Sequence, residues 1–125
     1  MKNFTNLLVT FLLSFAFTFV SAQTTYDVTF RVDMKNVDPT TFTTPEVNGT
    51  FNSWCGNCNP LSDADGDNIW EATIPLQDGT YEFKYSADAW GIQESLTPGG
   101  SCVITTGAYT NRLLTVAGAN VDLGT

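Results

Sequence analysis

The chain of 125 residues carries 13 acidic and 5 basic side chains and no histidine, for a formal net charge of −8 at pH 7. Because nucleic acids and anionic membranes attract basic surfaces, this charge disfavours both as partners and leaves neutral polysaccharide open. The length fits a single domain. Without histidine, a Gly-x-Ser-x-Gly motif or a phosphate-binding loop, catalysis is not expected.

The N-terminal segment has the pattern of a secretory signal peptide. Lys2 supplies a positive start, residues 7–20 form a mostly apolar run, and Val20-Ser21-Ala22 ends it with small residues. The run has about 14 residues, whereas a membrane span needs about 20. We therefore expect cleavage after Ala22, no membrane span, and export to the medium or the cell surface. The mature chain, residues 23–125, then holds 4 basic and 13 acidic residues, which gives a formal net charge of 4 − 13 = −9.

After this leader the sequence predicts short strands separated by turn residues. These strands are recognised by alternating apolar and polar residues, by β-branched and aromatic content, and by flanking Gly, Pro, Asn and Asp. The predicted strands are residues 26–34, 46–51, 69–76, 80–86, 102–106 and 112–117, and a further one begins at Val121. Six to eight short strands at this spacing indicate an all-β fold, an immunoglobulin-like antiparallel β-sandwich.

Alternation also assigns side chains to the two faces of each strand. The predicted core side chains of the first, third and fourth strands are Val28, Phe30, Val32, Trp70, Ala72, Ile74, Tyr81, Phe83 and Tyr85. Lys84 then points away from the core. Asp78-Gly79 supplies the hairpin turn before this strand, since Gly readily adopts positive φ.

The chain ends as a new strand begins at Val121. We expect from this that the β-sandwich domain, residues 23–125, is truncated at its C-terminus. Such a domain could be appended to a larger secreted enzyme.

Three cysteines, Cys55, Cys58 and Cys102, are candidates for one structural disulfide in an exported protein, and their pairing is left open. The Cys55-x-x-Cys58 spacing resembles a redox or zinc half-site. However, Asn59-Pro60 argues against the helix that a redox motif needs, and zinc lacks a fourth ligand.

Three alternate carboxylates in the long polar loop, Asp63, Asp65 and Asp67, could converge on a structural calcium ion. The EF-hand pattern fails, because its sixth position is Asn68 and its twelfth is Ile74. A polar loop between strands explains the same residues, so no cofactor is expected.

Five segments, in their order and spacing, form a further pattern. They are residues 47–54 (VNGTFNSW), 59–61 (NPL), 79–85 (GTYEFKY), 88–90 (DAW) and 111–116 (NRLLTV). This arrangement resembles the glycogen- and starch-binding domains of the immunoglobulin-like E-set group, found beside α-glucan-active enzymes and in β subunits of AMP-activated protein kinase. The resemblance covers residues 47–116.

The resemblance implies a non-catalytic carbohydrate-binding module for an α-glucan. Trp54 and Trp90 would stack on sugar rings, and Lys84 and Asn111 would hydrogen-bond sugar hydroxyls. Each residue also has a plainer interpretation: the tryptophans as lids on the core, Lys84 as a solvated strand residue, and Asn111 as a turn residue. The protein would then be an immunoglobulin-like spacer or protein-interaction domain.

The family pattern lacks the Cys55-Gly56-Asn57-Cys58 segment, which is an insertion directly beside Trp54. It could brace or narrow the platform, so the resemblance leaves the identity of the polysaccharide open.

Overall fold

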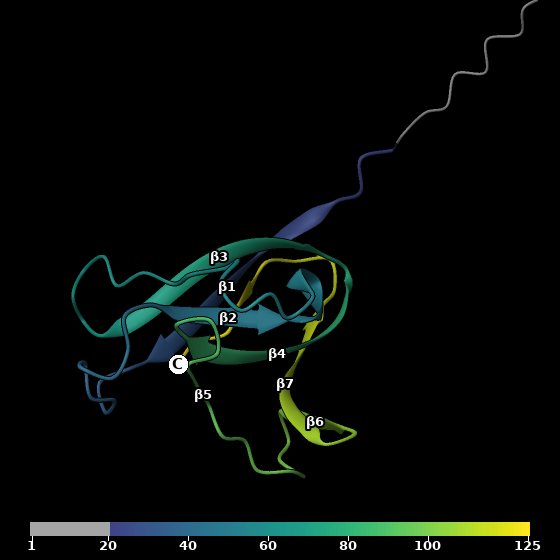
Figure 1. Ribbon diagram of the computed structural model, residues 1–125. Helices are drawn as coiled ribbons and strands as arrows, with labels where there is room; N and C mark the ends of the chain where they lie inside the picture. Colours follow the sequence, from purple (N-terminus) through teal and green to yellow (C-terminus); the bar gives the residue numbers. More distant parts are fainter. Residues whose placement is uncertain (1–20) are drawn as a thin grey trace, which may run out of the picture.

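A computed structural model describes residues 21–125 (Figure 1). The predicted leader falls almost entirely on residues 1–20, outside the described residues. The elements in chain order are β1 (Thr25–Asp33), β2 (Pro45–Gly49), the 3-10 turn η1 (Thr50–Asn52), β3 (Ile69–Gln77), β4 (Gly79–Ala87), β5 (Ile92–Gln93), β6 (Val103–Thr106), β7 (Tyr109–Val116) and β8 (Val121–Asp122). Between residues 21 and 125 no helix has the length and apolar character to cross a membrane.

The strands form two sheets, as an all-β sandwich requires. A three-stranded sheet has the order β3-β1-β8, and a larger sheet has the order β2-β4-β7-β6, with β5 beside the end of β4. Neighbours pair antiparallel except β1 and β8, which are parallel. The predicted β-sandwich class is therefore confirmed at this level.

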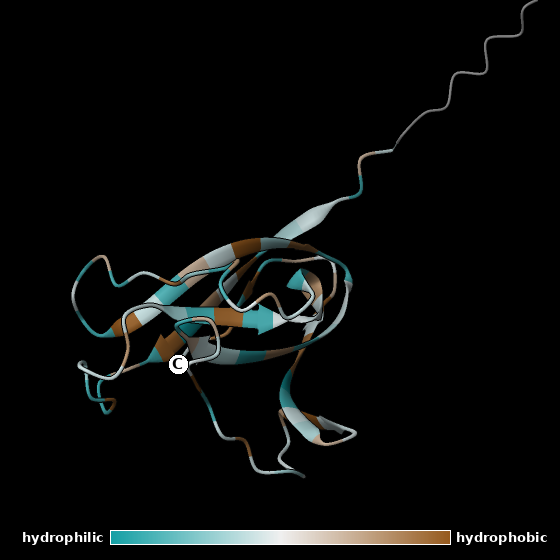
Figure 2. Ribbon diagram, in the orientation of Figure 1, coloured by the Kyte–Doolittle hydropathy of each residue, from teal (hydrophilic) through white to brown (hydrophobic). Residues whose placement is uncertain are grey.

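The core lies between the sheets and is built from the apolar positions of the alternating strands (Figure 2). Its buried members are Val28, Phe30, Val47, Leu61, Leu76, Phe83, Tyr85, Leu114 and Val116. Partly buried side chains, among them Trp70 and Phe51, pack against it, as the alternation predicts for Trp70. Burial raises the pKa of the Tyr85 phenol well above its usual range.

Some predicted element limits differ from the structure. Phe51 was expected to end a strand but lies in η1, and residues 109–111, expected to be a connection, are the start of β7. The predicted loop after Ala87 contains the short strand β5, which pairs with β4 through Ser86 and Ala87. Each of these differences concerns only two or three residues, which are too few for a hydrophobic period to define an element.

The register of the larger sheet determines which side chains share its outer face. Asn48 on β2 lies opposite Lys84 on β4, and Glu82 lies opposite Leu113 on β7. Residues directly opposite each other project to the same face, and so do alternate residues along a strand. Lys84 therefore projects away from the core, as predicted, in the company of Glu82, Asn111 and Asn48.

Candidate functional site

An open groove of about 610 Å³ crosses the outer face of the larger sheet. Its lining residues come from β4, β7 and β6 and from the segments after β2 and β4: Thr50, Trp54, Glu82, Lys84, Trp90, Gln93, Thr106, Tyr109 and Asn111. All four side chains that the sequence pattern singles out, Trp54, Trp90, Lys84 and Asn111, line this one groove. A volume of this size is typical of small-ligand sites.

One wall of the groove is made by Trp54 and Trp90. Their ring centroids lie 6.3 Å apart with the ring planes tilted by 37°, and the Trp90 indole Nε1 donates a hydrogen bond to the backbone oxygen of Trp54 (3.4 Å). Both indoles are half-buried. They therefore present aromatic surface to solvent and are not sealed into the core.

The backbone that carries Trp54 follows a tight turn held by Asn52. The Asn52 Oδ1 accepts hydrogen bonds from the backbone N–H groups of Gly49 (3.0 Å) and Trp54 (3.2 Å), while its Nδ2 donates to the Val47 oxygen (3.1 Å). A Cβ on Gly49 would lie 2.5 Å from the Glu82 backbone oxygen. Gly and Asn in the Gly49-x-Phe-Asn52-x-Trp54 segment thus position the first tryptophan.

The second tryptophan ends a run of three residues in the left-handed region, Asp88, Ala89 and Trp90, with φ of 54°, 54° and 71°. This conformation costs about 1 to 2 kcal/mol per non-glycine residue, so surrounding contacts must hold it. The Asp88 carboxylate accepts the backbone N–H groups of Thr43 and Thr44, each at 2.9 Å.

Cys55 and Cys58 form a disulfide, with Cα atoms 5.7 Å apart, which confirms the expected structural bond and resolves the pairing. Cys102 is exposed and free. The disulfide closes the loop around Gly56, whose position lies against the Trp90 indole: a Cβ built there would be 3.2 Å from Cδ1. The disulfide loop therefore follows Trp54 directly in the chain and lies against Trp90.

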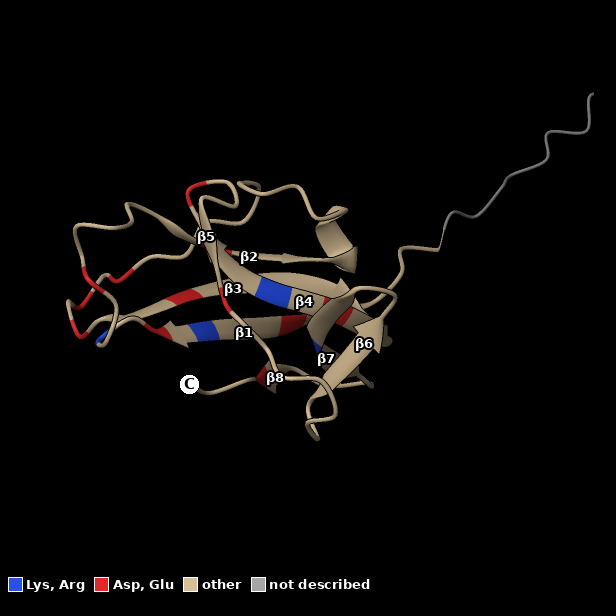
Figure 3. Ribbon diagram, turned by 60° about the horizontal axis from the view of Figure 1, so that its bottom comes forward, with Lys and Arg blue, Asp and Glu red and all other residues tan. Residues whose placement is uncertain are grey.

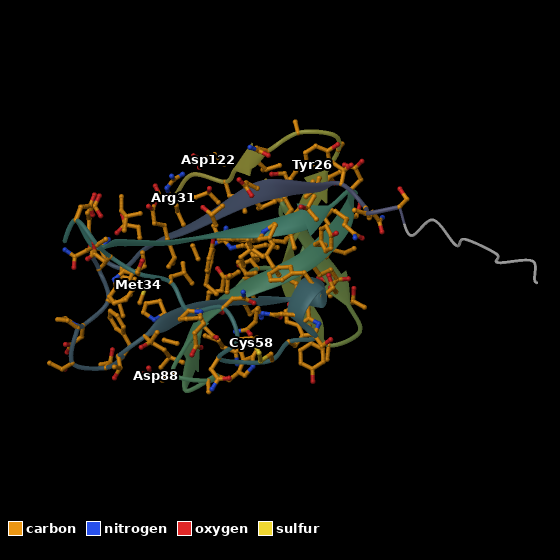
Figure 4. All side chains as sticks on the ribbon, turned by 90° about the horizontal axis from the view of Figure 1, so that it is seen from above. Tyr26, Arg31, Met34, Cys58, Asp88 and Asp122 are labelled. Atoms are coloured by element: carbon orange, nitrogen blue, oxygen red, sulfur yellow. A yellow bond between two sulfur atoms is a disulfide. The ribbon has the colours of Figure 1, made fainter. Side chains whose placement is uncertain are left out.

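A buried polar network beneath the groove joins the two tryptophan-bearing loops. Asn48, fully buried, bonds Gly56 in the first loop and donates to the Ser86 hydroxyl (2.9 Å). Ser86 in turn donates to the Glu46 carboxylate (3.2 Å), which accepts the Ala89 N–H in the second loop (3.1 Å). Figure 4 shows Cys58 and Asp88, one from each loop, on the same side of the molecule.

The floor of the groove is polar. Lys84 is the only basic residue of β4 (Figure 3) and makes no ion pair with any residue from 21 to 125. Asn111 is only 6% exposed, and its Nδ2 donates to the Glu82 carboxylate (2.9 Å). One of the two amide N–H donors of Asn111 is thus already used, and Glu82 is the acidic group that faces the groove.

The opposite wall comes from the β6–β7 hairpin, which extends from the sandwich in Figure 1. Thr106 and Tyr109 lie opposite each other at its turn, and Tyr109 is 72% exposed. The sequence pattern does not single out Tyr109, Thr106 or Glu82. The alternation of β4 placed Glu82 beside Lys84 on the outer face and could have identified it.

Away from the groove, Asp63, Asp65 and Asp67 do converge: their carboxylate oxygens lie within 4.8 Å of one another. The carboxylates of Asp63 and Asp67 also accept backbone N–H groups of their own loop, including those of Gly66 and Ile69. These three residues are the ones among those described that could hold a cation.

The fold and the groove together define an all-β sandwich with an open aromatic groove on its outer face. No protein family model matches the chain, and no curated protein matches it.

Proposed function

We propose that this protein is a non-catalytic carbohydrate-binding module for a neutral α-glucan, with Trp54 and Trp90 as its sugar platform. The observation that carries the proposal is the convergence of two partly exposed indoles with Lys84, Glu82 and Asn111 in one groove. In this account the domain is immunoglobulin-like and is exported through its N-terminal leader.

The chemistry of a pyranose ring fits this lining. A sugar has apolar C–H faces and a rim of hydroxyl groups that both donate and accept hydrogen bonds, so it suits flat aromatic surface beside fixed polar groups. Lys84 offers donors and Glu82 offers acceptors. The ligand needs no charge of its own to use both.

The angle between the two indole planes favours a polysaccharide chain that is curved. Because the two indole planes are inclined by 37°, two sugar rings stacked one on each indole would also be inclined to each other, as in a chain that turns. The same polysaccharide class follows from the resemblance of residues 47–116 to glycogen- and starch-binding domains.

The plainer functions receive less support from the geometry. A spacer domain with tryptophan lids calls for buried indoles, but both are partly exposed. Glycoside hydrolysis requires two carboxyl groups at the scissile bond in most families, and Glu82 is the only carboxylate among the described residues that line the groove.

Affinity gel electrophoresis through glycogen or amylopectin tests the proposal. Wild-type protein is expected to be retarded, and Trp54→Ala or Trp90→Ala should abolish most of the retardation, because each removes half of the platform. Trp70→Phe is the matched control, since Trp70 packs against the core and T-shaped on Phe42. Equal retardation of wild type and both alanine variants would contradict the platform.

A further inference from the structure

The hairpin wall of the groove carries an aromatic ring with no structural role in the core. Tyr109 is 72% exposed, the most open of the large apolar side chains between residues 21 and 125. In the sheet order β2-β4-β7-β6, the segment bearing Trp54 follows β2 at one edge, while Tyr109 lies at the β6–β7 turn at the other. Strand β4 separates the two walls.

Glu82 lies between these walls with its carboxylate fixed by neutral donors. The Thr106 hydroxyl donates to Oε1 (3.0 Å) and the Asn111 amide donates to Oε2 (2.9 Å). No ion pair to Glu82 is formed within residues 21–125. A carboxylate has about four acceptor positions, so acceptor capacity remains on a carboxylate whose orientation is already set.

We propose that Tyr109 and Glu82 form a second sugar subsite, distinct from the tryptophan platform and at the hairpin end of the same groove. Tyr109 stacks on a further pyranose ring, and Glu82 accepts hydrogen bonds from the hydroxyls of that sugar. This inference rests on the proposed function and adds to it: the ligand is a neutral oligosaccharide chain long enough to reach both walls.

The charge of the subsite sets its selectivity. A uronate or sulfate group beside Glu82 would place two negative charges in a partly buried site, which is unfavourable. Hydroxyl groups, in contrast, donate to the carboxylate at the strength of a charge-assisted hydrogen bond. The subsite therefore favours neutral sugars over acidic ones.

The test is a titration of the full chain with a ladder of linear malto-oligosaccharides of increasing length. Wild-type affinity should rise with length and then level off when both walls are occupied. Tyr109→Ala should bind short oligosaccharides as wild type does and bind long ones about tenfold more weakly, an effect of the size expected for one aromatic contact. Glu82→Gln should weaken the binding of long oligosaccharides more than that of short ones. Tyr109→Phe, which keeps the ring, should retain most of the gain.

Leu113→Ala is the matched control, because Leu113 is 41% exposed on the same face of β7 and does not line the groove. Thermal melting verifies that Glu82→Gln is folded. If Tyr109→Ala and Glu82→Gln follow the wild-type curve at every length, the second subsite is wrong and the tryptophan platform stands. If wild type binds no oligosaccharide of the ladder, the proposed function and the subsite are both overturned.

Discussion

Asn48 and Gly56 are joined by two hydrogen bonds that run in opposite directions. The Asn48 Nδ2 donates to the Gly56 backbone oxygen (3.1 Å), and the Gly56 N–H donates to the Asn48 Oδ1 (2.7 Å). A fully buried strand residue thus acts as a clamp on the disulfide loop. Because Gly56 lies against Trp90, the position of the platform depends on this clamp.

Asn48→Ala should therefore lower both stability and sugar affinity. The variant leaves the backbone groups of Gly56 and the Ser86 hydroxyl without their buried partner, at a cost of about 2 to 4 kcal/mol in the free energy of unfolding. Urea denaturation measures the loss, and affinity electrophoresis measures binding. Asn57→Ala, an exposed amide in the same loop, should leave both quantities near wild type. Wild-type stability in Asn48→Ala would show that the clamp is dispensable.

Gly56→Ala tests the contact with Trp90 directly. Gly56 has φ of +90°, and an added Cβ would lie 3.2 Å from the indole Cδ1. We expect a loss of about 1 kcal/mol or more in stability from the backbone conformation and weaker sugar binding from the displaced ring.

Gly66→Ala separates the effect of the backbone conformation on stability from the effect of the Trp90 contact on binding. Gly66 also has positive φ (+76°), but nothing lies within 4 Å of its added Cβ. This control should lose stability to a similar degree and keep its affinity. Equal affinity in both alanine variants would mean that the Gly56 contact does not position Trp90.

Loss of the Cys55–Cys58 disulfide should lower both the sugar affinity and the free energy of unfolding. The loop spans a sequence separation of 3, for which the chain-entropy estimate is about 2 kcal/mol. A double Cys55→Ser, Cys58→Ser variant should lose about that much stability and show reduced retardation on glycogen gels. Cys102→Ser, which alters an exposed free thiol, should change neither. A double variant with wild-type affinity would contradict the bracing role of the disulfide loop.

Acid should destabilise the β1–β8 edge. Hydrogen bonds from Arg31 and then from the Gly124 N–H hold the pKa of Asp122 below its usual range, and the backbone and side chain of Thr40 do the same for Asp38. A depressed folded-state pKa contributes stability above the unfolded pKa of about 3.9, and that stability is lost as the pH falls through the folded value. Asp122→Asn should therefore flatten the decline of the denaturation midpoint below about pH 4. An unchanged slope would contradict this assignment.

The sandwich was largely predictable because strand alternation is a strong local signal. In β1 and β4 the apolar positions, such as Phe30 and Phe83, are the buried ones, and the same period placed Lys84 outside. The short strand β5 was not predictable, since its two residues pair with β4 through tertiary contacts and carry no period of their own.

The groove was predictable only in part. Motif positions pointed to Trp54 and Trp90, and the structure brings them together with Lys84 and Asn111. That the Asn111 amide is held by Glu82 could not be inferred from sequence, because the pairing depends on the β4–β7 register. Tyr109 lies next to the Gly107-Ala108 turn, where the sequence predicts a loop, and only the pairing of β6 with β7 brings it to the groove.

A proton–nitrogen NMR spectrum, with the three indole N–H signals assigned through single Trp→Phe variants, shows whether Trp54 and Trp90 form a sugar platform. Titration with a linear malto-oligosaccharide should shift the signals of Trp54 and Trp90 and leave that of Trp70, on the other sheet, in place. Saturating sugar that moves neither the Trp54 nor the Trp90 signal would contradict the account.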